Sequence, residues 1–207
     1  MIKVLIVDDE RMIQELFSHY IAASSRYKLA GAIKSAANAE IYCLQAGVEL
    51  ILMDICTANN ESGIEAAKKI KKNYPHIKII MVTSAPDYRF IEKARDAGAD
   101  SFWYKEVGTR RLLEVMDKTM AGESVYPDDV PTVDVGLAKS TEFTKKEVEV
   151  LYYIVKGKGI GEIASLMAIE YSTAKWHIKN LKEKTGAKSI AELAVMVART
   201  KLILPEY

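Results

Sequence analysis

The stretch Leu50–Asp54 (LILMD) decides the fold, because it is a short apolar run that ends abruptly in a carboxylate. Runs of this length are typical of buried strands in a parallel sheet. A second run, Ile2–Val7 (IKVLIV), ends in the same way, in Asp8, Asp9 and Glu10. The carboxyl ends of parallel strands meet at one edge of an open α/β sheet, where ligands bind. We therefore expect several carboxylates to share one pocket.

Strand-like and helix-like segments alternate five times from residue 2 to residue 120. The predicted strands are residues 2–7, 28–33, 50–54, 77–82 and 101–104. Between them lie helical patterns, including residues 36–46 before Gly47, residues 63–74 before Pro75, and a helix with Pro86 in its first turn. This alternation predicts a doubly wound, five-stranded parallel sheet. Residues 55–62 are predicted to be a polar loop.

The chain after residue 121 has a different character. Residues 122–139 contain Pro127, Pro131 and little periodicity, which is typical of a linker. From residue 140 the pattern is helical, and from Lys139 onward twelve Lys or Arg residues face eight Asp or Glu residues. We predict a first domain at 1–121, a linker at 122–139 and a small all-α domain at 140–207. A basic C-terminal part that follows an acidic N-terminal part favours a nucleic-acid-binding module at the C-terminal end.

Composition restricts the class of protein further. No apolar run is long enough to cross a membrane, and strand-like sequence begins directly after Met1. The only cysteines are Cys43 and Cys56, which argues against a disulfide framework. The sequence therefore predicts a cytoplasmic protein that does not bind to or span a membrane.

Five polar residues follow the ends of the predicted strands: Asp8, Asp9, Asp54, Thr83 and Lys105. A cluster of carboxylates needs a cation, and oxygen ligands favour Mg²⁺. A carboxylate beside Mg²⁺, with a hydroxyl and an ammonium group nearby, can accept a phosphoryl group. We predict that Asp54 is the nucleophile. Simple solvated strand ends are one alternative. A phosphatase with an aspartyl nucleophile is another, which an Asp-x-Asp pattern would favour over the adjacent pair seen here.

These five residues, in this order and spacing, resemble the receiver domain of bacterial two-component response regulators over residues 1–121. The resemblance implies a flavodoxin-like sheet and phosphorylation of Asp54 by a partner histidine kinase. It also implies Mg²⁺ held by Asp9, Asp54 and the backbone carbonyl of Cys56, with Asp8 helping through water. Phe102 matches the aromatic switch residue, which rotates inward when Thr83 moves toward the phosphoryl group.

Two features depart from the receiver pattern. The loop from Ile55 to Gly63 is one residue longer than usual and lacks the common Met-Pro pair. Lys105 is followed by Glu106 where the family has proline. These departures leave the conformation of the loop and the lifetime of the phosphoryl group open, although neither removes a ligand.

The back end contains the pattern of a helix-turn-helix module. Thr144 and Glu147 form a capping-box pattern at the start of one helix. The glycine-rich stretch 157–161 follows a helix rather than a strand and lacks a Gly-Lys-Ser/Thr ending, so we interpret it as a turn. A short helix and then a helix over about residues 172–184, with cations on its outer face, complete the pattern.

In detail this region resembles the LuxR/NarL-type DNA-binding domain over about residues 140–200. The residues that carry the resemblance include Phe143 to Leu151, Gly157, Glu162-Ile163-Ala164, Leu166, Thr173, Lys175, His177 and Gly186. The resemblance implies that the helix over 172–184 enters the major groove of double-stranded DNA. Thr173, Lys175, Trp176 and Lys179 are the predicted contacts.

The sequence thus predicts a transcriptional response regulator that is not a conventional enzyme. The only reactions that we expect its receiver domain to catalyse are its own phosphorylation and dephosphorylation. By resemblance it would form a homodimer when phosphorylated. Two alternatives stay open. In one, DNA binding is independent of phosphorylation because the loop after Asp54 is degenerate. In the other, the protein is an adaptor whose basic helix binds protein instead of DNA.

Overall fold

The computed structural model describes residues 1–105 and 109–203. The chain forms two compact units, one made of residues 1–84 and 88–129 and one made of residues 130–207 together with 85–87. Among the helices described, none is both long and apolar enough to cross a membrane.

The first unit is built on a parallel five-stranded sheet with the order β2-β1-β3-β6-β7. Its strands are β1 (Ile2–Val7), β2 (Tyr27–Ile33), β3 (Leu50–Asp54), β6 (Lys78–Thr83) and β7 (Ser101–Tyr104). Every residue of β3 is buried, as expected for a central strand that is covered on both faces. The predicted fold class is therefore confirmed.

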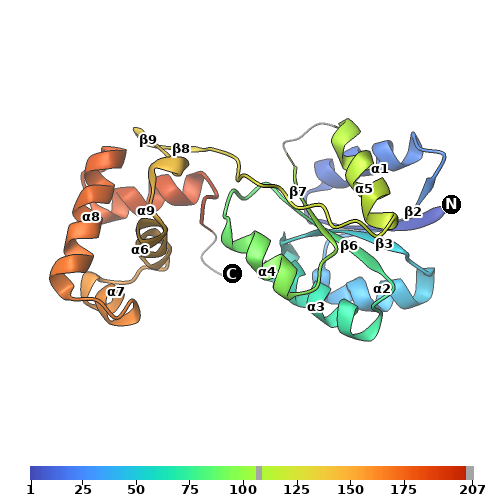
Figure 1. Ribbon diagram of the computed structural model, residues 1–207, viewed down its shortest axis with the longest axis horizontal. Helices are drawn as coiled ribbons and strands as arrows, with labels where there is room; N and C mark the ends of the chain where they lie inside the picture. The colour runs from blue at the N-terminus through green and yellow to red at the C-terminus, as the bar shows by residue number, and fades with distance from the viewer. Residues whose placement is uncertain (106–108, 204–207) are drawn as a thin grey trace. The chain divides into compact units, whose positions relative to one another are not determined.

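Helices cover both faces of this sheet (Figure 1). On one face lie α1 (Arg11–Ala22) and α5 (Thr109–Met120), and on the other lie α2 (Ala39–Ala46), α3 (Gly63–Asn73) and α4 (Arg89–Asp96). On the α1 and α5 face, Phe17 packs edge-on against Trp103 with ring centroids 5.9 Å apart. Alternate residues of the central strands complete this core, among them Val4, Ile6, Leu50, Leu52, Ile80 and Val82.

Three local elements differ from the sequence prediction. The predicted helix over 36–46 is divided into a short 3₁₀ turn η1 (Ala36–Asn38) and helix α2, which ends at Gly47 in a left-handed conformation. Helix α4 begins at Arg89, so Pro86 lies before the helix rather than in its first turn. The predicted polar loop after Asp54 contains a small antiparallel hairpin, formed by β4 (Cys56–Thr57), the turn η2 (Ala58–Asn60) and β5 (Glu61–Ser62).

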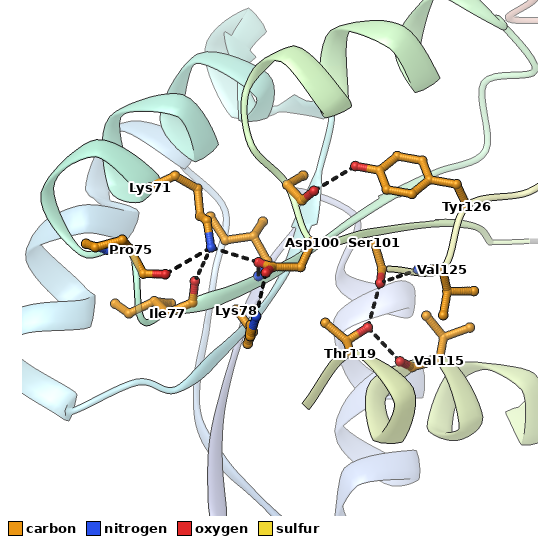
Figure 2. A network of polar contacts seen from close by, with 12 residues as sticks. Lys71, Pro75, Ile77, Lys78, Asp100, Ser101, Val115, Thr119, Val125 and Tyr126 are labelled. Carbon is orange, nitrogen blue, oxygen red and sulfur yellow. Dashed lines mark hydrogen bonds and ion pairs between the residues drawn. The ribbon is translucent and has the colours of Figure 1, made fainter. Parts of the chain in front are cut away.

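Strand β7 is at the edge of the sheet and is fixed by polar contacts at its start (Figure 2). Asp100 accepts from Lys71 Nζ at 2.9 Å, Lys78 Nζ at 2.8 Å and the Ile79 amide at 2.9 Å. Next to it, the buried Ser101 hydroxyl lies 2.7 Å from Thr119 Oγ1 of α5. These contacts fix the strand that leads to Lys105.

The second unit consists of short helices (Figure 1). Before these helices lies a small antiparallel hairpin with two residues in each strand, β8 (Asp134–Val135) and β9 (Ala138–Lys139). A 3₁₀ turn, η3 (Ser140–Glu142), follows it. The helices are α6 (Lys145–Val155), α7 (Ile160–Leu166), α8 (Tyr171–Thr185) and α9 (Ile190–Arg199). Their core comprises Val150, Leu151, Ile154, Ile163, Ala174, Ile178, Leu181, Leu193 and Val197.

Helix α6 begins as the sequence predicts. Thr144 Oγ1 accepts from the Glu147 amide at 3.2 Å, and Glu147 Oε2 accepts from the Thr144 amide at 2.8 Å. This reciprocal capping box satisfies two amides at the start of the helix. Glu147 is buried and also pairs with Lys184 Nζ of α8 at 2.9 Å, so the cap ties α6 to α8.

Candidate functional site

Three carboxylates meet at the carboxyl edge of the sheet. Asp8 follows β1, Asp9 is the next residue, and Asp54 ends β3, which is paired with β1. One oxygen from each lies within 4.8 Å of the others. Asp8 and Asp54 are buried, whereas Asp9 is exposed, so the cluster opens to solvent on one side. The two strands thus bring Asp54 together with acids that are 45 and 46 residues before it in the chain.

Lys105, the residue that follows β7, completes this cluster. Its Nζ lies 2.7 Å from Asp54 Oδ2 and 2.8 Å from Asp8 Oδ2. The lysine side chain is 5% exposed, so both ion pairs are shielded from water. One ammonium group faces three carboxylates, which leaves a surplus of negative charge in the pocket.

The ionisation of the cluster reflects this burial. Burial raises the pKa of Asp54 to about 7, because the Lys105 ammonium offsets only part of the desolvation and Asp8 adds repulsion. Burial also raises the pKa of Asp8, against the opposing effect of Lys105. The pKa of Lys105 is raised as well, since Asp54 and Asp8 together outweigh its own desolvation. Negative charge here is costly without a further cation.

The donor set fits a hard divalent cation. Mg²⁺ prefers oxygen ligands, usually one or two carboxylates together with water, and an open side of the site leaves room for that water. The oxygens of Asp8, Asp9 and Asp54 provide this arrangement. Such a trio of acids is typical of the magnesium site of receiver domains.

Thr83 lies at the same edge of the sheet. It ends β6, whose preceding residue, Val82, is the register partner of Asp54. The Thr83 side chain is buried, and its carbonyl accepts from the Lys105 amide at 2.9 Å. Thr83, which carries a hydroxyl group, is therefore the residue directly after the one that pairs with Asp54 across the sheet.

Phe102 is buried in β7 and is covered by the segment that follows α5. Its amide donates to the Val125 carbonyl at 2.8 Å, and its ring lies 5.1 Å from that of Tyr104 and 6.3 Å from that of Tyr126. The Tyr126 hydroxyl in turn donates to the Ala99 carbonyl at 2.7 Å (Figure 2). Residues 125–126, predicted as part of the linker, therefore lie along the outer edge of β7.

The hairpin after Asp54 gives the lengthened loop a defined conformation. Cys56 pairs with Ser62 and Thr57 pairs with Glu61. The turn places Asn59 and Asn60 at φ values of 60° and 57°, in the left-handed region that asparagine tolerates. Asparagine is one of the residues that favour such turns, so the pair Asn59-Asn60 is a sequence signal of this hairpin that apolar periodicity does not detect.

The hairpin leads directly into α3 at Gly63. The Gly63 amide donates to the Ile55 carbonyl at 2.9 Å, and a Cβ at this position would collide with the carbonyl oxygen of Asp54. Ser62 then caps the helix by accepting from the Glu65 amide at 3.3 Å. The chain therefore returns close to Asp54 before α3 begins. Glu106, the other departure from the receiver pattern, lies outside the described residues.

A second candidate site is the exposed face of α8. Ala174, Ile178 and Leu181 point into the core of the second unit, as the periodicity predicts. The predicted DNA contacts lie on the outer surface: Thr173, Lys175, Trp176 and Lys179 are all exposed. Trp176 is 57% exposed, so its indole ring is accessible to a partner.

A groove of about 760 Å³ runs along this face toward the start of α9. Lys175, Trp176 and Lys179 line it, together with Lys182 and Lys188. Lys188 was not among the predicted contacts, because it lies after α8 and only the fold brings it to the same groove. Clustered cations beside an exposed indole suit a polyanion such as the DNA backbone.

Comparison with known proteins follows the same division of the chain. Residues 4–117 match the family model described as "Response regulator receiver domain", and residues 141–197 match "Bacterial regulatory proteins, luxR family". The chain is 32% identical to the response regulator protein VraR of Staphylococcus aureus (strain Mu3 / ATCC 700698) over 207 residues, which cover 98% of this chain and 99% of that protein.

Two solved structures share the fold along nearly the whole chain. RcsB of Salmonella enterica serovar Typhimurium, bound to promoter rprA in the presence of phosphomimetic BeF₃⁻, has a TM-score of 0.61 at 19% identity and covers 96% of this chain and 98% of its own. A structure of two RcsB dimers bound to two parallel DNAs has a TM-score of 0.65 at 17% identity, with 95% and 98% covered.

The two family matches, the full-length relative and the carboxylate site all agree. They identify a class of signalling protein rather than a conventional enzyme. The chain therefore belongs to the two-component response regulators of the LuxR/NarL type, with a receiver domain followed by a helix-turn-helix DNA-binding domain.

Proposed function

We propose that Asp54 accepts a phosphoryl group from a histidine kinase and that this modification controls DNA binding by α8. The observation that carries the proposal is the position of the Asp54 carboxylate. It lies beside Asp8 and Asp9 and 2.7 Å from the ammonium group of Lys105. A nucleophile with acids on one side and a fixed cation on the other suits phosphoryl transfer, in which positioning and charge neutralisation dominate.

In this proposal Asp9, Asp54 and the backbone carbonyl of Cys56 hold Mg²⁺, and Asp8 acts through a water molecule. The bound metal would neutralise charge on the carboxylates and on the incoming phosphoryl oxygens. The surplus negative charge of the pocket and its oxygen donors support this assignment.

The proposed reaction transfers a phosphoryl group from a phosphohistidine donor to Asp54. An Asp54 carboxylate oxygen forms a bond to phosphorus while the bond from phosphorus to the imidazole nitrogen breaks. The electron pair of that bond leaves with the imidazole, and Asp54 becomes an acyl phosphate. Lys105 stabilises the phosphoryl oxygens electrostatically, and the Thr83 hydroxyl donates a hydrogen bond to one of them.

The proposed output depends on the packing around Phe102. A phosphoryl group adds roughly one to two negative charges at Asp54, which draws Thr83 toward it and frees space for the Phe102 ring. The change in packing biases the receiver between two states, one of which favours homodimers.

Paired α8 helices would then read two half-sites on double-stranded DNA, and the contacts would be Thr173, Lys175, Trp176 and Lys179. The related RcsB structures, in which dimers bind DNA, support this arrangement. The proposal places the protein in the cytoplasm, where response regulators typically act.

Two experiments separate this function from its alternatives. Genomic DNA fragments that the full chain retains in the presence of beryllofluoride and Mg²⁺ are selected first, and enrichment of none would indicate an adaptor. The selected fragment is then titrated with and without beryllofluoride and Mg²⁺, which mimic the phosphoryl group. Tighter binding with the mimic, lost in Asp54→Ala, supports the proposal. Equal binding in both conditions would indicate a regulator that works without phosphorylation.

A further inference from the structure

Hydrogen bonds tether the hairpin of residues 56–62 to the segment that follows β2. Thr57 is buried, and its Oγ1 accepts from the Ala36 amide at 3.1 Å and donates to the Glu61 carbonyl at 3.1 Å. The Ala58 amide donates to the Lys34 carbonyl at 3.0 Å. A two-residue ladder is not stable alone, so the position of the hairpin depends on such tethers.

Glu61 makes the strongest of these tethers. Its carboxylate accepts from Ser35 Oγ at 2.6 Å and from the Ala37 amide at 3.1 Å. These hydrogen bonds hold the pKa of Glu61 below its usual range, so the group is charged at neutral pH. Hydrogen bonds to an ionised acceptor are stronger than neutral ones. Because Ser35 belongs to the segment after β2, these bonds join two loops at the carboxyl edge of the sheet.

We propose that Glu61 is a positioning residue for the metal site. By holding the hairpin against residues 35–37, it fixes the backbone of Cys56, whose carbonyl is the third protein ligand in the function proposed above. The inference rests on that proposed function. It assigns a role to a residue of the lengthened loop that the receiver pattern does not include.

The register of the hairpin connects Glu61 to Cys56. Glu61 pairs with Thr57, the neighbour of Cys56, and the next pair joins Cys56 to Ser62. A shift of Glu61 therefore moves the Cys56 peptide through the ladder. Mg²⁺ demands near-octahedral geometry, and the loss of outer-shell partners commonly weakens metal binding by about 10-fold to 100-fold. The extra loop residue would allow more freedom than Mg²⁺ tolerates, and the Glu61 tether removes that freedom.

The test is the Mg²⁺ affinity of the full chain, which needs no kinase and no DNA. Trp176→Phe leaves Trp103, two residues before Lys105, as the only tryptophan, and its fluorescence is followed during a titration with Mg²⁺. In this background Glu61→Ala should weaken Mg²⁺ binding by about 10-fold. Glu61→Gln keeps an acceptor oxygen and should recover most of the loss. Ser35→Ala removes the same bond from the other side, and the double variant should be no weaker than Glu61→Ala.

Glu65→Ala is the matched control, because it removes an exposed carboxylate from the first turn of α3 and should leave Mg²⁺ affinity unchanged. The inference is overturned if Glu61→Ala and Ser35→Ala bind Mg²⁺ as the parent chain does. Should Glu61→Ala fail to fold by circular dichroism, Glu61→Gln and Ser35→Ala decide the question through the same titration. Asp9→Ala distinguishes a failure of the proposed metal site from a failure of the Glu61 tether alone. If the parent chain binds Mg²⁺ no better than Asp9→Ala, the proposed metal site fails as well as the tether.

Discussion

The Nζ atom of Lys105 lies 2.7 Å from Oδ2 of Asp54. The same atom lies 2.8 Å from Oδ2 of Asp8, so one buried ammonium group is shared between two buried carboxylates. Charges that are removed from water stabilise a fold only when they are well paired. The site therefore depends on Lys105 for its stability as well as for its proposed chemistry.

Lys105→Met should destabilise the first unit in metal-free buffer. The substitution leaves Asp8 and Asp54 without their cation, and breaking a buried ion pair costs about 3 to 5 kcal/mol. Added Mg²⁺ should recover a larger part of the free energy of unfolding in the variant than in the parent chain, because the metal replaces the missing charge. Urea unfolding in the Trp176→Phe background, followed by Trp103 fluorescence, measures both effects. The control is Lys68→Met, at an exposed position of α3. A variant as stable as the parent without metal would contradict the account.

The capping carboxylate of Glu147 predicts how the second unit responds to acid. Burial raises the pKa of Glu147, but its hydrogen bonds to Lys184 and Thr144 outweigh burial and lower it overall. A lowered pKa in the folded state contributes stability above the unfolded value of about 4.3, and this stability is lost as pH falls through the folded pKa. Glu147→Gln should therefore reduce the free energy of unfolding at neutral pH by about 1 to 3 kcal/mol. Thermal unfolding should show the difference from the parent shrinking below pH 4.

Glu149→Gln provides the comparison for this experiment. Glu149 is on the same helix and pairs with Lys146 at 3.3 Å, but these side chains are 40% and 59% exposed. Exposed pairs contribute little, so this variant should follow the parent at every pH. Equal losses in the two variants would mean that the buried cap has no special role.

The lysines of α8 predict the salt dependence of DNA binding. Lys175→Ala and Lys179→Ala should each reduce the slope of log affinity against log salt by about one, because each removes one phosphate contact. Lys146→Ala, at an exposed position of α6, should leave the slope unchanged. The measurement is a salt titration of binding to the selected genomic fragment. Unchanged slopes for both α8 variants would assign their side chains to solvent.

The contact of residues 125–126 with β7 predicts protection of the Phe102 amide. Arg95 lies over the Tyr126 ring at 3.8 Å, and burial raises the pKa of Tyr126 to about 12, so its hydroxyl stays a donor to Ala99. Tyr126→Ala should release the segment and speed hydrogen exchange at Phe102, whose amide donates to Val125. Tyr126→Phe keeps the ring and should have a smaller effect. Equal protection in Tyr126→Ala and the parent would rule out this anchoring role.

The sheet and its helices were predictable because local patterns specify them. The apolar runs Ile2–Val7 and Leu50–Asp54 became neighbouring strands, and the carboxylates at their ends came together for that reason. The Thr144 and Glu147 capping box also formed as predicted. In each case the deciding interaction is either local in sequence or imposed by the topology of parallel strands.

The remaining features depend on contacts between distant segments. The hairpin after Asp54 is fixed by Ser35 and Ala36, and no local pattern around residue 60 names those partners. Helix α4 begins only at Arg89, although Pro86 is compatible with a first helical turn. Lys188 lies between α8 and α9 and also lines the groove of α8. Sequence periodicity carries no information about such long-range contacts.

The site of phosphorylation is the most direct test of the account. The full chain is incubated with acetyl phosphate and Mg²⁺, and intact-mass spectrometry counts the phosphoryl groups it gains. The account predicts one group on the parent chain and on Asp128→Asn, a control at an exposed position. It predicts none on Asp54→Asn and none when EDTA removes the metal. A phosphoryl group that Asp54→Asn still acquires, or a parent chain that acquires none, would contradict the assignment of Asp54 as the acceptor.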